Sequence, residues 1–108
     1  MEPLSRITPA TVDVLSVLDS SGEAVWGMLV IKSSGRPAGS VYPILERLEQ
    51  AGWVTSAWED DPSRVGPRRR FYELTSDGAA AARAAIGEFA RKHASRPGSI
   101  AAATAVVA

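Results

Sequence analysis

Apolar side chains recur with the period of an amphipathic helix in three parts of this chain, at residues 8–20, 37–51 and 76–93. The first part begins well for a helix, because Thr8 can cap the free N–H groups and Pro9 suits the first helical position. The pattern therefore predicts three amphipathic helices. The apolar spacing of the third is that of a coiled-coil-like seam.

Two points of this pattern stay open. Residues 27–34 form a short apolar run that periodicity alone cannot assign to a helix or a strand. Pro43 lies inside the central pattern, where it would remove the hydrogen bond to the Gly39 carbonyl if the helix begins near Pro37. If Ser40 is the N-cap instead, the proline removes nothing. We favour the earlier start, because a glycine four residues before the proline obstructs its ring least.

Residues 53–58 and 70–75 are rich in β-branched and aromatic side chains, which predicts two antiparallel strands. The polar segment 59–69 between them contains prolines and a glycine, and this composition indicates a long hairpin loop. Trp53 and Trp58 have opposite parity along the first strand, so one can lie in the core while the other is freer. The expected fold is mainly α, with a two-stranded β-hairpin that packs on the helices.

Composition and length indicate one globular domain. The 108 residues are 45% hydrophobic and 22% charged, which excludes wholesale disorder. No apolar run approaches the roughly 20 residues of a membrane span, and the first residues lack the pattern of a signal peptide. We therefore expect a cytoplasmic protein that does not associate with membranes. Because the chain has no cysteine and a single histidine, His93, we expect no metal site and no cofactor.

Catalytic arrangements find little support. The segment 35–40 has two glycines and a serine near a helix start, but it lacks the lysine and the spacing of a P-loop. Glu59, Asp60 and Asp61 are neighbouring carboxylates in a hydrophilic loop, where solvation is the simpler explanation. We therefore expect no enzymatic activity.

A short element, a tight glycine-containing turn and a second amphipathic helix match helix–turn–helix geometry, in which the second helix enters the major groove. The net charge is zero, but ten of the twelve basic residues are arginines, which suit phosphate and guanine edges. Residues expected to meet DNA from the second helix are Gly39, Ser40, Tyr42, Pro43 and Arg47. The alternatives are that Tyr42 lies in the core and that Arg47 pairs with Glu46 or Gln50. Lys32 and Arg36 are expected to bind phosphates.

Basic residues are densest at the mouth of the hairpin. A basic wing can reach phosphates or the adjacent minor groove. The expected wing contacts are Arg64, Arg68, Arg69 and Arg70. A charged loop offset by the acidic residues before it is the alternative, and the clustering on the hairpin favours DNA.

Two blocks of the chain resemble the PadR family of transcriptional regulators. Residues 39–54, which begin GSVYPIL, are similar to the recognition helix and first wing strand of that family. Residues 66–78 resemble its wing and the Leu-Thr-x-x-Gly motif that leads into its last helix. The resemblance covers about residues 8–92 and implies that Pro43 lies within the recognition helix.

The resemblance implies a winged helix–turn–helix with a C-terminal dimerisation helix. Its parts would be a DNA-binding domain (1–75), the dimerisation helix (76–93) and a low-complexity tail (94–108). The last helix of each subunit would pack on the first helix of the other. The interface residues would be Val14, Leu18, Ala79, Ala82, Ile86 and Phe89. The resemblance also implies a homodimeric repressor that binds an inverted repeat in double-stranded DNA. In some members a small aromatic or drug-like effector binds at the dimer interface.

Two other functions are compatible with these residues. A winged-helix adaptor between proteins would suit the zero net charge, and it predicts weak, non-saturating DNA binding. A small-molecule-binding dimer without DNA function would use tryptophan-lined pockets. It predicts that a ligand quenches tryptophan fluorescence without affecting any DNA interaction.

Overall fold

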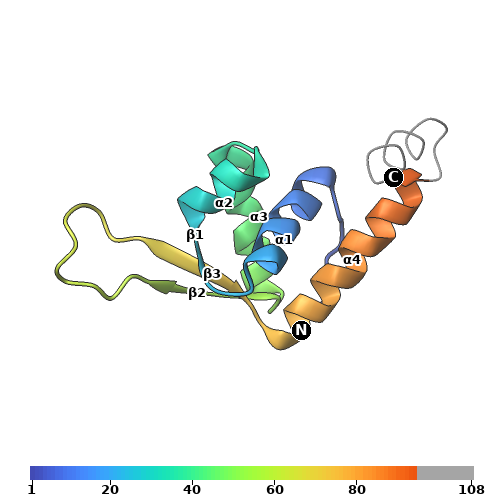
Figure 1. Cartoon of the computed structure of the whole chain (residues 1–108). Coiled ribbons are helices and arrows are strands. Elements are labelled where there is room, and N and C mark those ends of the chain that lie inside the picture. The colour runs from blue at the N-terminus through green and yellow to red at the C-terminus, as the bar shows by residue number, and fades with distance from the viewer. Residues whose placement is uncertain (95–108) are drawn as a thin grey trace.

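The computed structural model describes residues 1–94, which form four helices and three strands around one core (Figure 1). In chain order the elements are α1 (Pro9–Ser21), β1 (Val25–Trp26), α2 (Gly27–Ser34), α3 (Ala38–Gln50), β2 (Val54–Trp58), β3 (Arg70–Leu74) and α4 (Ser76–Ala94). The predicted mainly α architecture with a hairpin wing and a C-terminal helix is confirmed. Of the predicted tail, Ala94 ends α4, and residues 95–108 lie outside the described residues.

Local capping explains where the helices begin. The Thr8 hydroxyl accepts a 3.1 Å hydrogen bond from the Thr11 backbone N–H at the start of α1. At the start of α4, the Thr75 hydroxyl accepts a 2.9 Å bond from the Gly78 N–H. Helix α3 begins directly after Pro37, so Pro43 lies inside it and the earlier of the two predicted starts is confirmed. Residues 27–34, which periodicity could not assign to a helix or a strand, form the helix α2.

The sheet has one strand more than predicted. The strand order is β1-β3-β2, and β1 pairs antiparallel with β3 through Val25 opposite Tyr72 and Trp26 opposite Phe71. The predicted hairpin is present as β2 and β3, and β1 adds a third strand that was not predicted. Two residues are too short to show any period, and the pairing joins segments almost fifty residues apart. Its consequence is that the wing is attached to the α1–α2 connection as well as to α3.

The core lies between α1, α2, α3 and the inner face of the sheet. Its largest fully buried side chains are Leu15, Leu45, Leu48, Val14, Val30, Val41 and Val54. Trp53 is 5% exposed and Trp58 is 52% exposed, so the prediction that these two tryptophans have different surroundings is confirmed. Within residues 1–94, no helix is long and apolar enough to cross a membrane.

Residues 1–7, which we call the arm, run along one side of this core. The Glu2 backbone N–H donates a 2.8 Å bond to the Ala51 carbonyl, and Trp53 Nε1 donates a 2.6 Å bond to the Glu2 carbonyl. Leu4 and Ile7 pack against the core. The arm is thus attached at the α3–β2 corner and at the cap of α1.

Helix α4 packs along α1 of the same chain, and the wing projects away from the opposite side of the molecule (Figure 1). The first turn of α4 contacts the backbone just before β2, at Trp53. A Cβ atom at Gly78 would lie 1.9 Å from the Trp53 carbonyl oxygen, a distance that no side chain can occupy. Glycine at this position therefore allows α4 to begin in backbone contact with the sheet.

Candidate nucleic-acid interface

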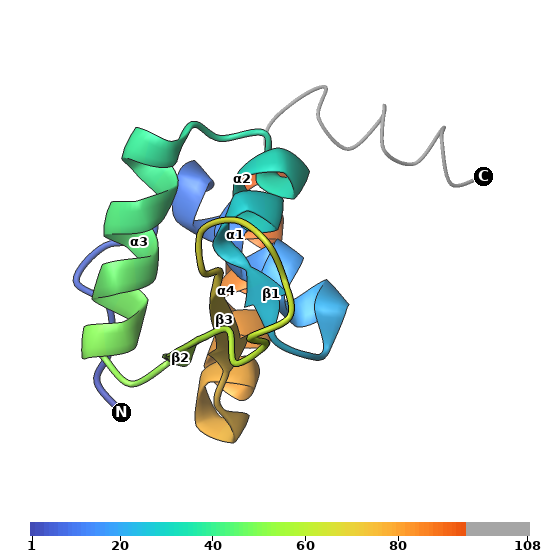
Figure 2. The same cartoon turned by 90° about the vertical axis from the view of Figure 1, so that its left-hand side faces the viewer.

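One face of α3 is uncovered. In Figure 2, α3 stands at the edge of the part of the chain that the structure describes, with no other described helix over its outer side and with the wing loop beside it toward the viewer. Gly39, Tyr42, Pro43 and Arg47 are exposed on this helix and Ser40 is half-buried. The five residues expected to meet DNA from α3 therefore lie on accessible positions.

Sequence reasoning missed two residues of the same face. Glu46 and Gln50 are exposed, four residues apart, and lie opposite the buried stripe that contains Leu48. A glutamate carboxylate can accept from the cytosine amino group, and a glutamine amide can pair with adenine. A helical projection of residues 38–50 would have found both, because they lie directly opposite the apolar stripe.

Tyr42 lies at the border between this face and the core. Its side chain is 41% exposed, so the alternative of a core tyrosine does not hold. A Cβ atom at Gly27, the first residue of α2, would lie 3.2 Å from Tyr42 Cε1 and 3.3 Å from Tyr72 Cε1. The missing side chain at Gly27 thus leaves room for both rings. Burial raises the pKa of the Tyr72 hydroxyl above its ordinary value, against the opposing charge of Arg70.

Hydrogen bonds connect α3 to the wing. Ser56 on β2 donates a 2.5 Å bond from its hydroxyl to Glu49 Oε2 on α3. Arg70 Nη2 on β3 donates a 2.6 Å bond to the same Ser56 oxygen and lies 3.8 Å from Glu49 Oε2. The Arg70 guanidinium also lies 5.0 Å from the centre of the Trp58 ring. Arg70 therefore joins three elements, with part of its charge balanced inside the chain.

The wing loop, residues 59–69, is held by its own side chains. Arg64 Nε forms a 2.5 Å ion pair with Glu59 Oε1, and this guanidinium also donates to the Val65 and Pro67 carbonyls. Arg68 donates bonds of 3.1 and 3.3 Å to the Glu59 carbonyl. The Arg64 guanidinium therefore forms its contacts within the loop and stabilises the conformation of the loop. The charge of Arg68 is not paired with a carboxylate in the described chain, and its side chain is exposed.

Asp61 and Arg69 add to the order of the loop. Asp61 Oδ1 accepts bonds of 2.6 and 3.1 Å from the Ser63 hydroxyl and N–H, which lower the pKa of this carboxyl. The Arg69 guanidinium lies 4.1 Å from the centre of the Trp26 ring on β1. Its Nε is buried without a hydrogen-bond partner among the described residues.

The two cations expected to bind phosphates, Arg36 and Lys32, also differ in whether a carboxylate pairs with them. Arg36 Nε forms a 2.8 Å ion pair with Asp13 Oδ2, whereas Lys32 is exposed at the end of α2. Within residues 1–94, the predicted DNA contacts that form no ion pair with a carboxylate are Lys32, Arg47, Arg68 and Arg69. The alternative in which Arg47 is neutralised by a neighbour on α3 therefore finds no support.

The residues expected at a dimer interface fall into two groups. Val14, Leu18 and Ala82 are at most 2% exposed in the single chain, because α4 packs on α1 of its own protomer. They leave no surface for a second copy in this arrangement. Ala79, Ile86 and Phe89 are half-buried and keep part of their surface.

Comparison with known proteins agrees with this architecture. A family model described as the transcriptional regulator PadR-like family matches residues 14–84. A PadR family transcription regulator from Clostridium difficile R20291 is 21% identical, with 81% of this chain and 95% of that chain covered and a TM-score of 0.65. A putative DNA-binding protein from Ralstonia eutropha JMP134 is 28% identical, with coverage of 73% and 96% and a TM-score of 0.59.

The transcriptional regulator PcaV from Streptomyces coelicolor, solved in complex with its natural ligand, is also similar in structure. It is 21% identical, with coverage of 83% of this chain and 60% of that chain and a TM-score of 0.65. Among curated protein sequences no match was found.

The family match covers most of α1, the whole helix–turn–helix and wing, and the first half of α4. It confirms the resemblance inferred from the two sequence blocks. PadR family members are transcriptional regulators and not enzymes. The chain therefore belongs to the PadR-like family of transcriptional regulators.

Proposed function

We propose that this protein is a cytoplasmic, homodimeric repressor that binds an inverted repeat in double-stranded DNA. The observation that carries this proposal is the uncovered face of α3, held at a fixed position relative to the wing by Glu49, Ser56 and Arg70. A recognition helix needs such a support, because base contacts tolerate little displacement.

The distribution of charge supports the same function. Among residues 1–94, the predicted DNA contacts without a carboxylate partner lie on α3 and on two elements beside it: Arg47 on α3, Lys32 on α2, and Arg68 and Arg69 on the wing. Separate cations of this kind can hold phosphates on both sides of a groove while α3 meets the base edges. On this basis, base discrimination comes from the outward stripe that includes Glu46 and Gln50, and phosphate contacts come from the cations.

The last turns of α4 support dimerisation. A cavity of about 230 Å³ lies beside them, and its lining residues are Ile7, Ala85, Glu88, Phe89, Lys92 and His93. The Phe89 and His93 rings stack there with their centres 3.9 Å apart. We propose that a second copy covers this surface together with Ile86 and Ala79. PcaV is a similar structure that was solved with its natural ligand bound, and we propose that a small aromatic effector binds to this protein in the cavity beside α4.

DNA binding is tested by selecting duplexes from a random pool and titrating the best one against its scrambled counterpart at several salt concentrations. We expect tight binding to the selected duplex alone, with an affinity that falls steeply with salt because counterions are released. Gln50→Ala should change the preferred base at one position of each half-site. Arg83→Gln, which removes an exposed cation on α4, is the matched control and should leave the preference unchanged.

Equal and feeble binding to both duplexes would contradict the proposal, and a stable complex with another protein would then favour the adaptor. Light scattering tests the dimer separately. Phe89→Asp should yield monomers that keep the helical content of the wild type. A dimer that survives this change would show that the interface lies elsewhere.

A further inference from the structure

A second cavity lies on the side of α3 that faces away from the wing. It has a volume of about 230 Å³ and is enclosed by the arm, the start of α1 and the middle of α3. The residues that line it are Leu4, Ser5, Arg6, Thr8, Thr11, Ile44, Arg47 and Leu48. Of these three elements only α3 belongs to the helix–turn–helix. The arm, Thr8 and Thr11 precede the region that the family model matches.

The lining of this cavity is cationic. It contains two arginines and three hydroxyl side chains, and it contains no carboxylate. Neither Arg6 nor Arg47 forms an ion pair or side-chain hydrogen bond with another of the described residues. In contrast, Arg36, Arg64 and Arg70 each have a carboxylate within 4 Å. The two charges at the cavity are therefore not compensated by a carboxylate of residues 1–94.

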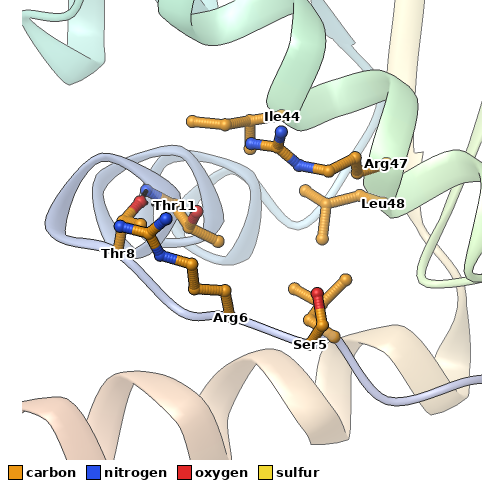
Figure 3. A pocket seen from close by; sticks show the side chains of 8 residues that line it. Ser5, Arg6, Thr8, Thr11, Ile44, Arg47 and Leu48 are labelled. Carbon is orange, nitrogen blue, oxygen red and sulfur yellow. Dashed lines mark hydrogen bonds between the residues drawn. The ribbon is translucent and has the colours of Figure 1, made fainter.

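The two arginines approach from opposite walls. Figure 3 shows Arg6 extending from the arm toward Thr8 and Thr11, and Arg47 extending from α3 past Leu48, so both guanidinium groups point toward the start of α1. Helix α1 has no acidic residue in its first turn, so the positive end of its dipole is also uncompensated there. Leu48 and the other apolar lining residues keep part of the wall dry, which strengthens charge interactions.

The position of Arg6 is fixed by the attachments of the arm. Glu2 is bound to the α3–β2 corner by two hydrogen bonds, and Thr8 caps α1. These attachments on both sides of Arg6 place its backbone across the cavity from Arg47. Without the arm, Arg47 would be a single exposed cation rather than one half of a pair.

We propose that Arg6 and Arg47 form an oxyanion site that takes a phosphate group. A planar guanidinium donates two parallel bonds to phosphate oxygens, and two of them can hold one group from both sides. The volume is below the 300 Å³ or more that is usual for drug-sized ligands, which suits a small anion. The phosphate can be free or part of a DNA backbone beside α3. The second source rests on the proposed DNA-binding function.

Two measurements on the full chain test this site. The first titrates inorganic phosphate without DNA and follows the side-chain Nε–H signals of the arginines by NMR. We expect the signals of Arg6 and Arg47 to shift together, and the shift at Arg47 to disappear in Arg6→Gln. Arg83→Gln, on α4, is the matched control and should leave both shifts unchanged.

The second measurement compares the salt dependence of DNA binding for wild type, Arg6→Gln, Arg47→Gln and the double variant. If one backbone phosphate is held by both, each single change should lower the slope of log affinity against log salt by about 0.9. The double variant should lower it little further. A phosphate-induced shift without this DNA effect would assign the site to a free anion. A DNA effect without the shift would assign it to the backbone.

Absence of both effects would overturn the proposal. If the wild type binds no DNA sequence at all, the proposed repressor function fails, and the phosphate titration then decides the oxyanion site by itself. Thermal unfolding of Arg6→Gln should match the wild type, since this exposed side chain has no hydrogen-bond partner to lose.

Discussion

The Ser56 hydroxyl on β2 donates a 2.5 Å hydrogen bond to the Glu49 carboxylate on α3. Glu49 is on the last turn of the recognition helix, and Ser56 is the middle residue of the first wing strand. The two parts that would meet DNA are therefore joined by side chains as well as by the connecting corner. A change in one should be felt by the other.

A double-mutant cycle measures this connection. Glu49→Ala and Ser56→Ala should each lower the free energy of unfolding by about 1 kcal/mol, because each removes one partner of a charge-assisted hydrogen bond that is only partly buried. The double variant should lose less than the sum of the two. Urea unfolding of the four proteins gives the coupling energy, and strict additivity would show that the bond contributes nothing.

Two glycines of α4 make a matched pair. Gly78→Ala should destabilise the fold by about 3 kcal/mol or more, because the new Cβ would overlap the Trp53 carbonyl and backbone cannot yield easily. Gly87→Ala meets only the flexible end of Arg91 at 3.4 Å and should stabilise the helix by up to about 1 kcal/mol. Thermal unfolding compares the two variants. Equal effects would contradict the close contact at the start of α4.

A substitution at Gly39 should affect DNA binding without affecting folding. A Cβ atom at this position has no neighbour within 4 Å in the free chain, so Gly39→Ala should leave stability unchanged or slightly raised. At a DNA surface the same methyl group would hold α3 away from the groove. We expect a several-fold loss of affinity for the selected duplex in a fluorescence-anisotropy titration. Unchanged affinity would place Gly39 outside the interface.

Arg68 and Arg70 should behave differently although they are two residues apart. Arg68 is exposed and unpaired with a carboxylate among residues 1–94, so Arg68→Gln should lower the salt slope of DNA binding by about 0.9. It should lower stability less than Arg70→Gln does, because it loses only exposed hydrogen bonds to the Glu59 carbonyl. Arg70→Gln should lower stability, because it releases Ser56 and Glu49. Unfolding curves and salt titrations on both variants test this. Identical behaviour would mean that both act only through charge.

The stability of the protein should depend on Tyr72 in alkaline solution. Burial raises the pKa of this hydroxyl in the folded chain above the ordinary 10.0 that the unfolded chain retains. The unfolded state then releases the proton first, so the contribution is complete below pH 10 and is lost as the pH rises through the folded pKa. Between pH 9 and 12, wild type should lose more stability than Tyr72→Phe. Parallel curves would contradict the shift.

The sequence was sufficient for elements that have a period or a cap. The helix at 38–50 was predictable because its apolar side chains follow one stripe, and α4 because Thr75 and Gly78 mark its start. The apolar run that became α2 could not be assigned, since eight residues with apolar side chains on several sides fit a helix and a strand alike. β1 was missed because a two-residue strand is defined only by its partner.

The sequence was enough to name the candidate residues of the site, but it could not show which of their charges are paired with carboxylates of the same chain. The arginines of the wing stand out by number, whereas their pairing depends on the path of the loop. Arg64 turns back to Glu59, and Arg70 reaches an acid on another element. Arg6 and Arg47 are forty-one positions apart in the sequence, and they line one cavity because the arm is attached to the core by the bonds of Glu2 and by the packing of Leu4 and Ile7. Long-range placement of this kind leaves no local signature.

Contact between Gly78 and the Trp53 carbonyl fixes the angle between α4 and the sheet. Because α4 starts in backbone contact, it cannot tilt at its root without separating from the sheet. In a dimer joined through the far end of α4, the orientation of each α4 then determines how far apart the two protomers lie. In the proposed dimer, a substitution at Gly78 that tilts α4 would therefore change the distance between the two copies of α3.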